Sequence, residues 1–157
     1  MYIHLVYMSS DEQMIEVLPL PCACATLRRA TRAVTQMYSK ALKHTGLGIT
    51  QFTVLRILKD KGETMQQELG ELLAVDSTTL TRTLKPMETN GLIASRPGED
   101  DRREKYFRIT SLGVRKIEST LSSWKKVQSE LKTALGDEAW DRLFRAADMA
   151  TAAAREQ

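Results

Sequence analysis

The feature that most constrains this fold is a three-residue turn between two amphipathic segments. Residues 74–76 separate a short helical pattern over 66–73 from a second one that runs toward Asn90-Gly91. Three residues leave room only for a tight turn, and either Asp76 or Ser77 can cap the second helix. Asn90-Gly91 is a typical helix stop. The pattern therefore predicts a helix-turn-helix.

A strand pair is predicted directly after it. Residues 92–96 and 105–110 are rich in apolar, β-branched and aromatic side chains, and the polar loop 97–104 between them begins with Pro97-Gly98. A β-hairpin after a helix-turn-helix is the wing of a winged-helix domain. We expect that domain to span residues 47–110, with its first helix capped by Thr50 and ended by Lys61-Gly62.

Long helical patterns flank this domain, over residues 22–46 and 111–157, and the second is expected to divide before Asp137. A heptad-like stripe, interrupted by Gln128, comprises Ile117, Leu121, Trp124, Leu131 and Leu135, and the last helix carries Trp140, Leu143, Phe144 and Ala147. Because the winged domain has its own core, a second copy of the chain is the economical partner for these surfaces. The predicted fold is mainly α with a small β-wing: a winged helix-turn-helix domain with N- and C-terminal dimerisation helices.

Composition and motifs exclude other classes of protein. Hydrophobic residues make up 42% and charged residues 27%, as in globular chains. No apolar run approaches a membrane span, and the N-terminal extension 1–21 lacks the basic start of a signal peptide. A cytoplasmic protein without a membrane partner is expected. His4 and His44 are far apart, and no phosphate loop or catalytic pattern is present, so we expect neither an enzyme nor a required cofactor.

The second helix of the pair has two chemically different faces. Leu80, Leu84 and Met87 share one face and are expected in the core. The residues opposite and beside them carry hydroxyl groups or positive charges, namely Thr78, Thr79, Thr81, Arg82 and Lys85. Such a surface suits base edges and phosphates in the major groove. The alternative is that its cations only keep the surface solvated.

Within this predicted interface, Arg82 is expected to contact a guanine or a phosphate, and Thr79 and Thr81 a thymine methyl or a phosphate. Pro86 removes one helical hydrogen bond and predicts a local bend after the base-reading turns.

At this point the chain resembles the MarR family of bacterial regulators. The resemblance covers roughly residues 27–157. It lies in the runs 80–88 and 90–93, in Asp101-Arg102-Arg103, and in Ile109-Thr110 followed by Leu112-Gly113. It implies a two-fold dimer with interlocked N- and C-terminal helices and two winged lobes, which binds double-stranded DNA and a small-molecule effector.

The wing tip is the second predicted DNA contact. Arg102 and Arg103 are adjacent, so an extended backbone points them to opposite sides and only one can enter the minor groove. The family motif Asp-x-Arg maps onto Asp101 and Arg103, which nominates Arg103 as the inserted side chain. Asp101 is expected to hold Arg103 or a neighbouring backbone amide. A solvated charged turn is the alternative.

Two candidates exist for the signal that releases DNA. The resemblance implies a pocket between the dimer helices and the winged lobe, often for phenolic compounds, and Arg29, Tyr38, Phe52 and Arg56 could line it. Core packing explains Tyr38 and Phe52 equally well.

The second candidate is Cys22 and Cys24, beside Arg28 and Arg29 at the start of a helix, where positive charge favours a reactive thiolate. A disulfide within Cys-x-Cys would be strained, so a bond to the partner subunit or a thiophilic metal ion is easier. Both cysteines can also be simple packing residues.

The sequence thus predicts a transcriptional repressor that acts as a homodimer on a pseudo-palindromic operator. The alternative is a helical adaptor that binds protein instead of DNA. An adaptor would present an apolar face on the helix 77–89, and Thr78, Arg82 and Lys85 argue against one.

Overall fold

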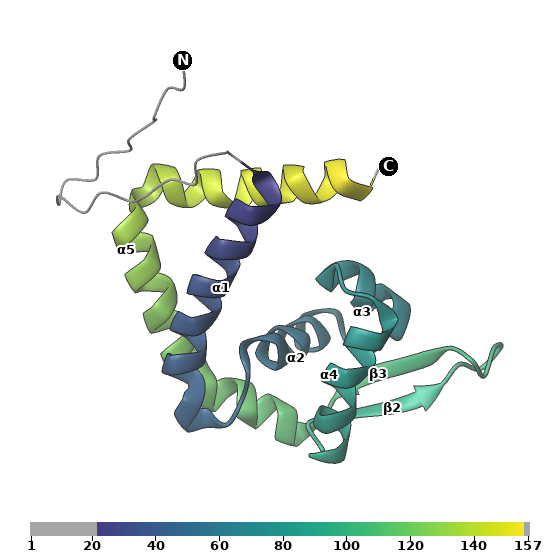
Figure 1. The fold of residues 1–157 in the computed structure, drawn as a ribbon. Coiled ribbons are helices and arrows are strands. Elements are labelled where there is room, and N and C mark those ends of the chain that lie inside the picture. Colours follow the sequence, from purple (N-terminus) through teal and green to yellow (C-terminus); the bar gives the residue numbers. More distant parts are fainter. Residues whose placement is uncertain (1–21, 156–157) are drawn as a thin grey trace. The chain divides into compact units, whose positions relative to one another are not determined.

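The computed structural model describes residues 22–155 and contains the elements drawn in Figure 1. In chain order they are α1 (Ala23–Leu42), the 3-10 turn η1 (Lys43–Thr45), α2 (Ile49–Lys61), β1 (Thr64–Met65), α3 (Gln66–Leu73), α4 (Ser77–Thr89), β2 (Ile93–Pro97), β3 (Lys105–Ile109) and α5 (Ser111–Arg155). Contacts divide the chain into two units, the first ending at Gln36 and the second beginning at Met37. The helices of the described range include none that is long and apolar enough to cross a membrane. The predicted extension 1–21 lies outside the described residues.

The helix-turn-helix forms where the sequence predicts it. Ala74 ends α3 in the left-handed backbone region, with φ of 50°. Asp76 then caps α4: its carboxylate accepts hydrogen bonds from the backbone N–H of Thr79 (2.8 Å) and from the Thr79 hydroxyl (2.7 Å). These bonds satisfy an N–H that the first turn of a helix would otherwise leave unpaired.

The start of α2 differs from the prediction. Thr50 is not its cap, because the helix already begins at Ile49 and the flanking extended residue is Gly48. The Gly48 N–H donates to Oε1 of Gln51 over 3.1 Å. The Gln51 side chain thus accepts the N–H of the residue that flanks the helix, which is one half of a capping box.

The core of the second unit is built from α2, α3, α4, the sheet and the first part of α5. Its buried residues are Leu47, Phe52, Val54, Leu55, Leu58, Leu69, Leu80, Leu84, Met87, Leu92, Ile93, Phe107 and Ile117. The predicted core face of α4 is confirmed, since Leu80, Leu84 and Met87 are all buried. Burial of this apolar area is the main stabilising contribution.

The wing belongs to a three-stranded antiparallel sheet with the strand order β1-β3-β2. Ser95 of β2 pairs with Phe107 of β3, and Arg96 pairs with Tyr106. Side chains alternate between the faces of a strand, so Ser95, Phe107 and Lys105 share the core face while Arg96 and Tyr106 share the outer face. The sequence analysis missed β1, whose Thr64 pairs with Phe107.

The long helix α5 is interrupted once. Gly136 has φ of 75° and ψ of 163°, which is not helical, and the chain bends there (Figure 1). The expected division before Asp137 therefore occurs. The first half of the predicted stripe does not await a partner: Ile117 is buried in the core, and Leu121 and Trp124 pack against it. The expectation that this part of the stripe covers another copy is corrected accordingly.

Candidate nucleic-acid interface

The polar face of α4 is available to a ligand. Thr78, Thr79, Thr81, Arg82 and Lys85 are exposed. They lie on the side away from the leucines and the methionine that anchor α4 in the core. The arrangement gives a surface with two cations and several methyl groups, and the apolar α4 face that a protein-binding adaptor would need is absent from it.

The local hydrogen bonds limit what the threonines can do. The Thr79 hydroxyl donates to Asp76, and the Thr81 hydroxyl donates to the carbonyl of Ser77 over 2.7 Å. Thr81 also accepts from the side-chain amide of Gln66 over 3.1 Å. Both hydroxyl protons are therefore engaged within the protein. What these residues offer outward is mainly their methyl groups, which suit the thymine methyl better than a phosphate acceptor.

The wing tip carries an exposed arginine with an ordered backbone. The Gly98 N–H donates to the Glu104 carbonyl over 2.9 Å, which closes the loop. Oδ1 of Asp101 accepts the backbone N–H of Arg103 over 2.8 Å and lies 3.8 Å from Arg103 Nε. The Arg103 side chain is 94% exposed. Asp101 thus fixes the backbone from which Arg103 extends, and Arg102 beside it is also exposed.

Two carboxylates at the base of the wing were not anticipated from the sequence. On the core face, Glu88 of α4 accepts a short hydrogen bond from the Ser95 hydroxyl and lies 3.3 Å from Lys105 Nζ. On the outer face, Glu63 accepts from Arg96 Nε at 2.9 Å and from Nη2 at 2.5 Å. The Arg96 guanidinium also lies 4.9 Å from the centre of the Tyr106 ring.

The pKa of Glu88 reflects these contacts. The hydrogen bond from Ser95 lowers it below the ordinary glutamate value, and the bond and charge of Lys105 lower it further, against a smaller opposing effect of burial. Glu88 is therefore an anion near neutral pH. No local pattern marks this residue in the sequence, because its partners come from two strands that follow it in the chain.

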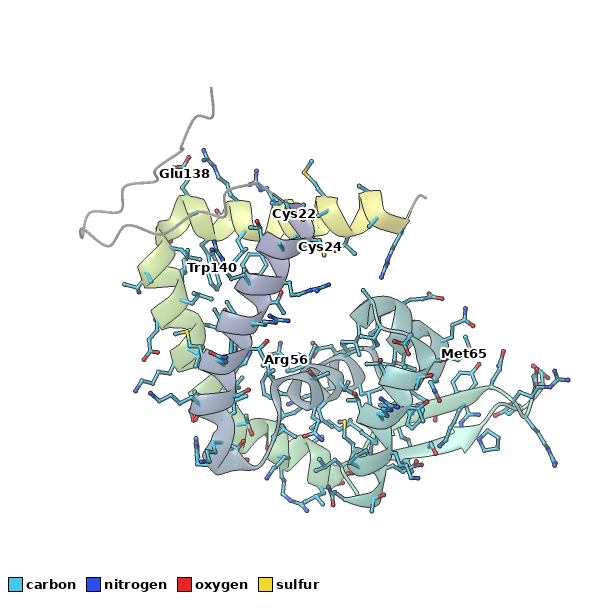
Figure 2. The ribbon with its side chains drawn as sticks, viewed as in Figure 1. Cys22, Cys24, Arg56, Met65, Glu138 and Trp140 are labelled. Carbon is cyan, nitrogen blue, oxygen red and sulfur yellow. The ribbon has the colours of Figure 1, made fainter. Side chains whose placement is uncertain are left out.

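The two cysteines lie at the start of α1 in the first unit (Figure 2). Cys22 precedes the helix and its carbonyl accepts the Thr26 N–H over 2.9 Å, while Cys24 lies in the first turn. Both thiols are free and exposed. Nη2 of Arg28 lies 3.7 Å from Cys24 Sγ. Within residues 22–155, no group of three or more His, Cys, Asp or Glu side chains could hold a metal ion.

Two of the predicted effector-pocket residues, Tyr38 and Phe52, are buried. Phe52 is 2% exposed and stacks on Trp124 with ring centroids 5.7 Å apart. The Arg56 guanidinium lies 5.5 Å from the centre of the same Trp124 ring. Tyr38 is buried, which raises its pKa above the ordinary tyrosine value. Arg29 lies on α1, in the first unit. Trp124 therefore contacts both Phe52 and Arg56, although in the sequence it shows only as part of the apolar stripe of α5.

Comparison with known proteins gives consistent similarities. The model of the MarR family matches residues 47–105. The uncharacterized transcriptional regulator YwoH of Bacillus subtilis is 33% identical over 76% of this chain and 88% of its own length. The organic hydroperoxide resistance transcriptional regulator of the same organism is 32% identical, over 58% of this chain and 62% of its own. The crystal structure of the M. tuberculosis regulator MosR in complex with DNA superimposes with a TM-score of 0.78 at 34% identity, covering 87% of this chain and 98% of MosR.

Proposed function

This chain belongs to the MarR family of winged helix-turn-helix transcriptional regulators, and from that premise we propose that it represses transcription as a homodimer bound to a pseudo-palindromic operator. It is a DNA-binding regulator, and such a role requires the cytoplasmic location expected from the sequence. The observation that carries the proposal is the pairing of an exposed cationic face on α4 with an exposed arginine at the wing tip.

Each predicted contact has a separate task in this proposal. Arg82 and Lys85 enter the major groove with α4, where Arg82 reads a guanine edge or holds a phosphate. Thr78, Thr79 and Thr81 supply methyl groups and helix-surface polarity beside them. Arg103 enters the neighbouring minor groove and senses its width, and Arg102 contacts the flanking phosphates.

The exposed apolar residues of the C-terminal part of α5 support the homodimer. Leu135, Leu143 and Phe144 are between 40% and 49% exposed, and Met149 is 73% exposed. Trp140 packs edge-on against Phe144 with ring centroids 5.0 Å apart. A second copy that covers this face gives a two-fold protein, which reads a two-fold site with half-sites about 34–36 Å apart.

We propose a thiol-reactive signal for release. A hydroperoxide oxidises one thiolate of the pair Cys22 and Cys24 to a sulfenic acid and is itself reduced to an alcohol, with water supplying the proton. A thiol of the partner subunit then attacks the sulfenic sulfur, a disulfide forms and water leaves. The exposure of both thiols and the contact of Arg28 with Cys24 support this route.

A small phenolic effector is the competing signal, and a thiophilic metal ion is a variant of the thiol model. The stacking of Phe52 on Trp124 within the core leaves the phenolic pocket with less support than the exposed thiols have. Two cysteine ligands per chain would leave a metal ion dependent on ligands from the partner subunit.

In-vitro selection tests the function most generally. The purified full chain is incubated with a library of random 30-base-pair duplexes, and the bound fraction is amplified over several rounds and sequenced. The expected result is enrichment of an inverted repeat whose half-sites are about one helical turn apart. Absence of any enriched sequence, in the presence of reductant, would overturn the proposal.

A further inference from the structure

Among the side chains of residues 22–155, Glu88 is the one that joins α4 to both strands of the wing by polar contacts. It lies in the last turn of α4, with one carboxylate oxygen on the Ser95 hydroxyl of β2 and the other 3.3 Å from Lys105 Nζ of β3. The Glu88 side chain is 36% exposed, so these contacts are only partly screened by solvent. Ser95 and Lys105 lie on the same face of the hairpin, as the register requires.

The position of Glu88 links the two predicted DNA contacts. It follows Arg82 and Lys85 on the same helix, which continues through Pro86. Its partner Lys105 is the next residue but one after Arg103, at the point where the wing loop becomes β3. The Lys105 ammonium also lies 5.0 Å from the centre of the Phe107 ring, and Phe107 is buried in the core. Phe107 thus limits where the Lys105 side chain can lie, and the contact of Lys105 with Glu88 connects the strand that carries the wing tip to α4.

The outer-face ion pair has a different effect. Glu63 precedes β1, and Arg96 lies on β2, so their bond crosses the central strand at Tyr106. It ties the three strands to one another and leaves α4 untouched. Apolar packing also holds α4 against the sheet, but such packing has no preferred direction. Hydrogen bonds and ion pairs are directional, so the Glu88 contacts, together with the backbone hydrogen bond from Leu92 to Met87 at the end of α4, specify how the hairpin is oriented on this helix.

We propose that Glu88 is a positioning residue that fixes the placement of the wing relative to α4, so that Arg82 and Arg103 reach adjacent grooves of one duplex together. This inference rests on the proposed DNA-binding function. It explains why a carboxylate is tolerated beside a surface that binds a polyanion: the repulsion from phosphate is offset by the ordering of two arginine contacts.

If Glu88 positions the wing, its replacement by glutamine weakens DNA binding, whereas the loss of a negative charge by itself would strengthen DNA binding. Removal of a negative charge near the DNA-binding surface strengthens binding if only electrostatics act, because phosphate neutralisation dominates affinity. Glu88→Gln keeps the size and can still accept from Ser95, but it presents an amide donor toward Lys105 and breaks the ion pair. Ser95→Ala removes the other contact without any change in charge. Asp100→Asn, at the exposed wing tip, is the matched control for loss of one negative charge.

The experiment measures the dissociation constant for the selected duplex at two salt concentrations. The proteins are wild type and the three variants, each with and without Arg103→Ala, and melting temperatures are recorded for all of them. We expect Glu88→Gln to weaken binding about tenfold and Ser95→Ala to weaken it less, within the coupling range for one hydrogen-bonded network. Asp100→Asn binds as wild type or more tightly. Arg103→Ala costs less affinity in the Glu88→Gln background than in wild type.

The cost of Arg103→Ala, compared between the wild-type and Glu88→Gln backgrounds, distinguishes a positioning role of Glu88 from a loss of stability. Partial unfolding reduces the active fraction but leaves the penalty of Arg103→Ala unchanged. If Glu88→Gln is unfolded at the assay temperature, the same comparison is made in the Ser95→Ala background, where Arg103→Ala should again cost less affinity than in wild type. Additive penalties, or tighter binding by Glu88→Gln, would overturn the inference while the proposed function stands. A wild-type protein that enriches no duplex would overturn both.

Discussion

Gly113 leaves no room for a side chain beside the carbonyl of Leu92: a Cβ atom on Gly113 would lie 2.2 Å from that oxygen and 2.7 Å from Ile109 Cγ1. Thr110 completes the junction, since its hydroxyl donates to the Gly91 carbonyl over 2.6 Å and accepts the Gly113 N–H over 3.1 Å. The Thr-x-x-Gly run is thus the joint between the end of α4, the last strand and α5.

Gly113→Ala is expected to destabilise the protein strongly, because the obstructing atom is backbone and cannot move aside cheaply. We expect a loss of about 1–3 kcal/mol in the free energy of unfolding, the range for overpacked sites. Urea denaturation measures it. Arg115→Ala, an exposed change two residues further along α5, is the control and should have almost no effect. Equal urea midpoints for the two variants would show that the backbone around Gly113 shifts to accept a methyl group without loss of stability.

The stabilising effect of Glu88 should depend on pH with a definite sign. Its pKa is lower in the folded protein than in the unfolded chain, so its contribution is fully present above the ordinary glutamate value of about 4.3 and is lost as the pH falls through the folded value. The difference in free energy of unfolding between wild type and Glu88→Gln is therefore largest near neutral pH and shrinks in acid. Urea titrations at pH 7 and at about pH 3.5 measure it. A difference that grows in acid would contradict the assigned contacts.

Removal of the chain after Leu135 should abolish the homodimer and keep the winged unit folded. The cut lies immediately before the break at Gly136, so Ile117 and Trp124 keep their places in and against the core. Truncation after Thr110 would instead remove Ile117 and confound assembly with folding. Sedimentation equilibrium should give a monomer for the shortened chain and a dimer for the full one. A shortened chain that remains dimeric would place the interface elsewhere.

The pair Cys22 and Cys24 should control DNA release by hydroperoxides. In a gel-shift titration with the selected duplex, cumene hydroperoxide is expected to release wild-type protein and leave the Cys22→Ser, Cys24→Ser double variant bound, because serine cannot form the disulfide. Arsenite and zinc are added in parallel to test the metal variant. Identical responses from both proteins would favour the small-molecule effector.

The sequence was sufficient for elements with strong local signals and insufficient for contacts between distant segments. α3 and α4 were located because a short turn and the cap Asp76 mark their ends. The strand β1 was missed because Thr64 and Met65 are too few to show alternation. The start of α2 was predicted wrongly because the helix already begins at Ile49, so Thr50 lies inside it, and Gly48 has no side chain that would mark the start.

The candidate site likewise has one part that the sequence predicts and one part that depends on contacts between distant segments. Helical periodicity separated the exposed Arg82 from the buried Leu84, so the polar face of α4 was predictable. The role of Glu88 was not, since it depends on which strand residues fold back onto α4. The apolar stripe on α5 was visible in the sequence, but periodicity cannot tell that Ile117 packs within its own domain while Leu135 remains exposed.

The most direct test of the account compares Arg82→Ala with Arg103→Ala on the selected duplex and on its single-base variants, at several salt concentrations. Loss of Arg82 should cost about 1–3 kcal/mol per half-site and relax specificity at one position of each. Loss of Arg103 should weaken binding evenly across core sequences and reduce the salt dependence. Wild-type affinity in both variants would contradict the assignment of α4 and the wing as the DNA-binding surface.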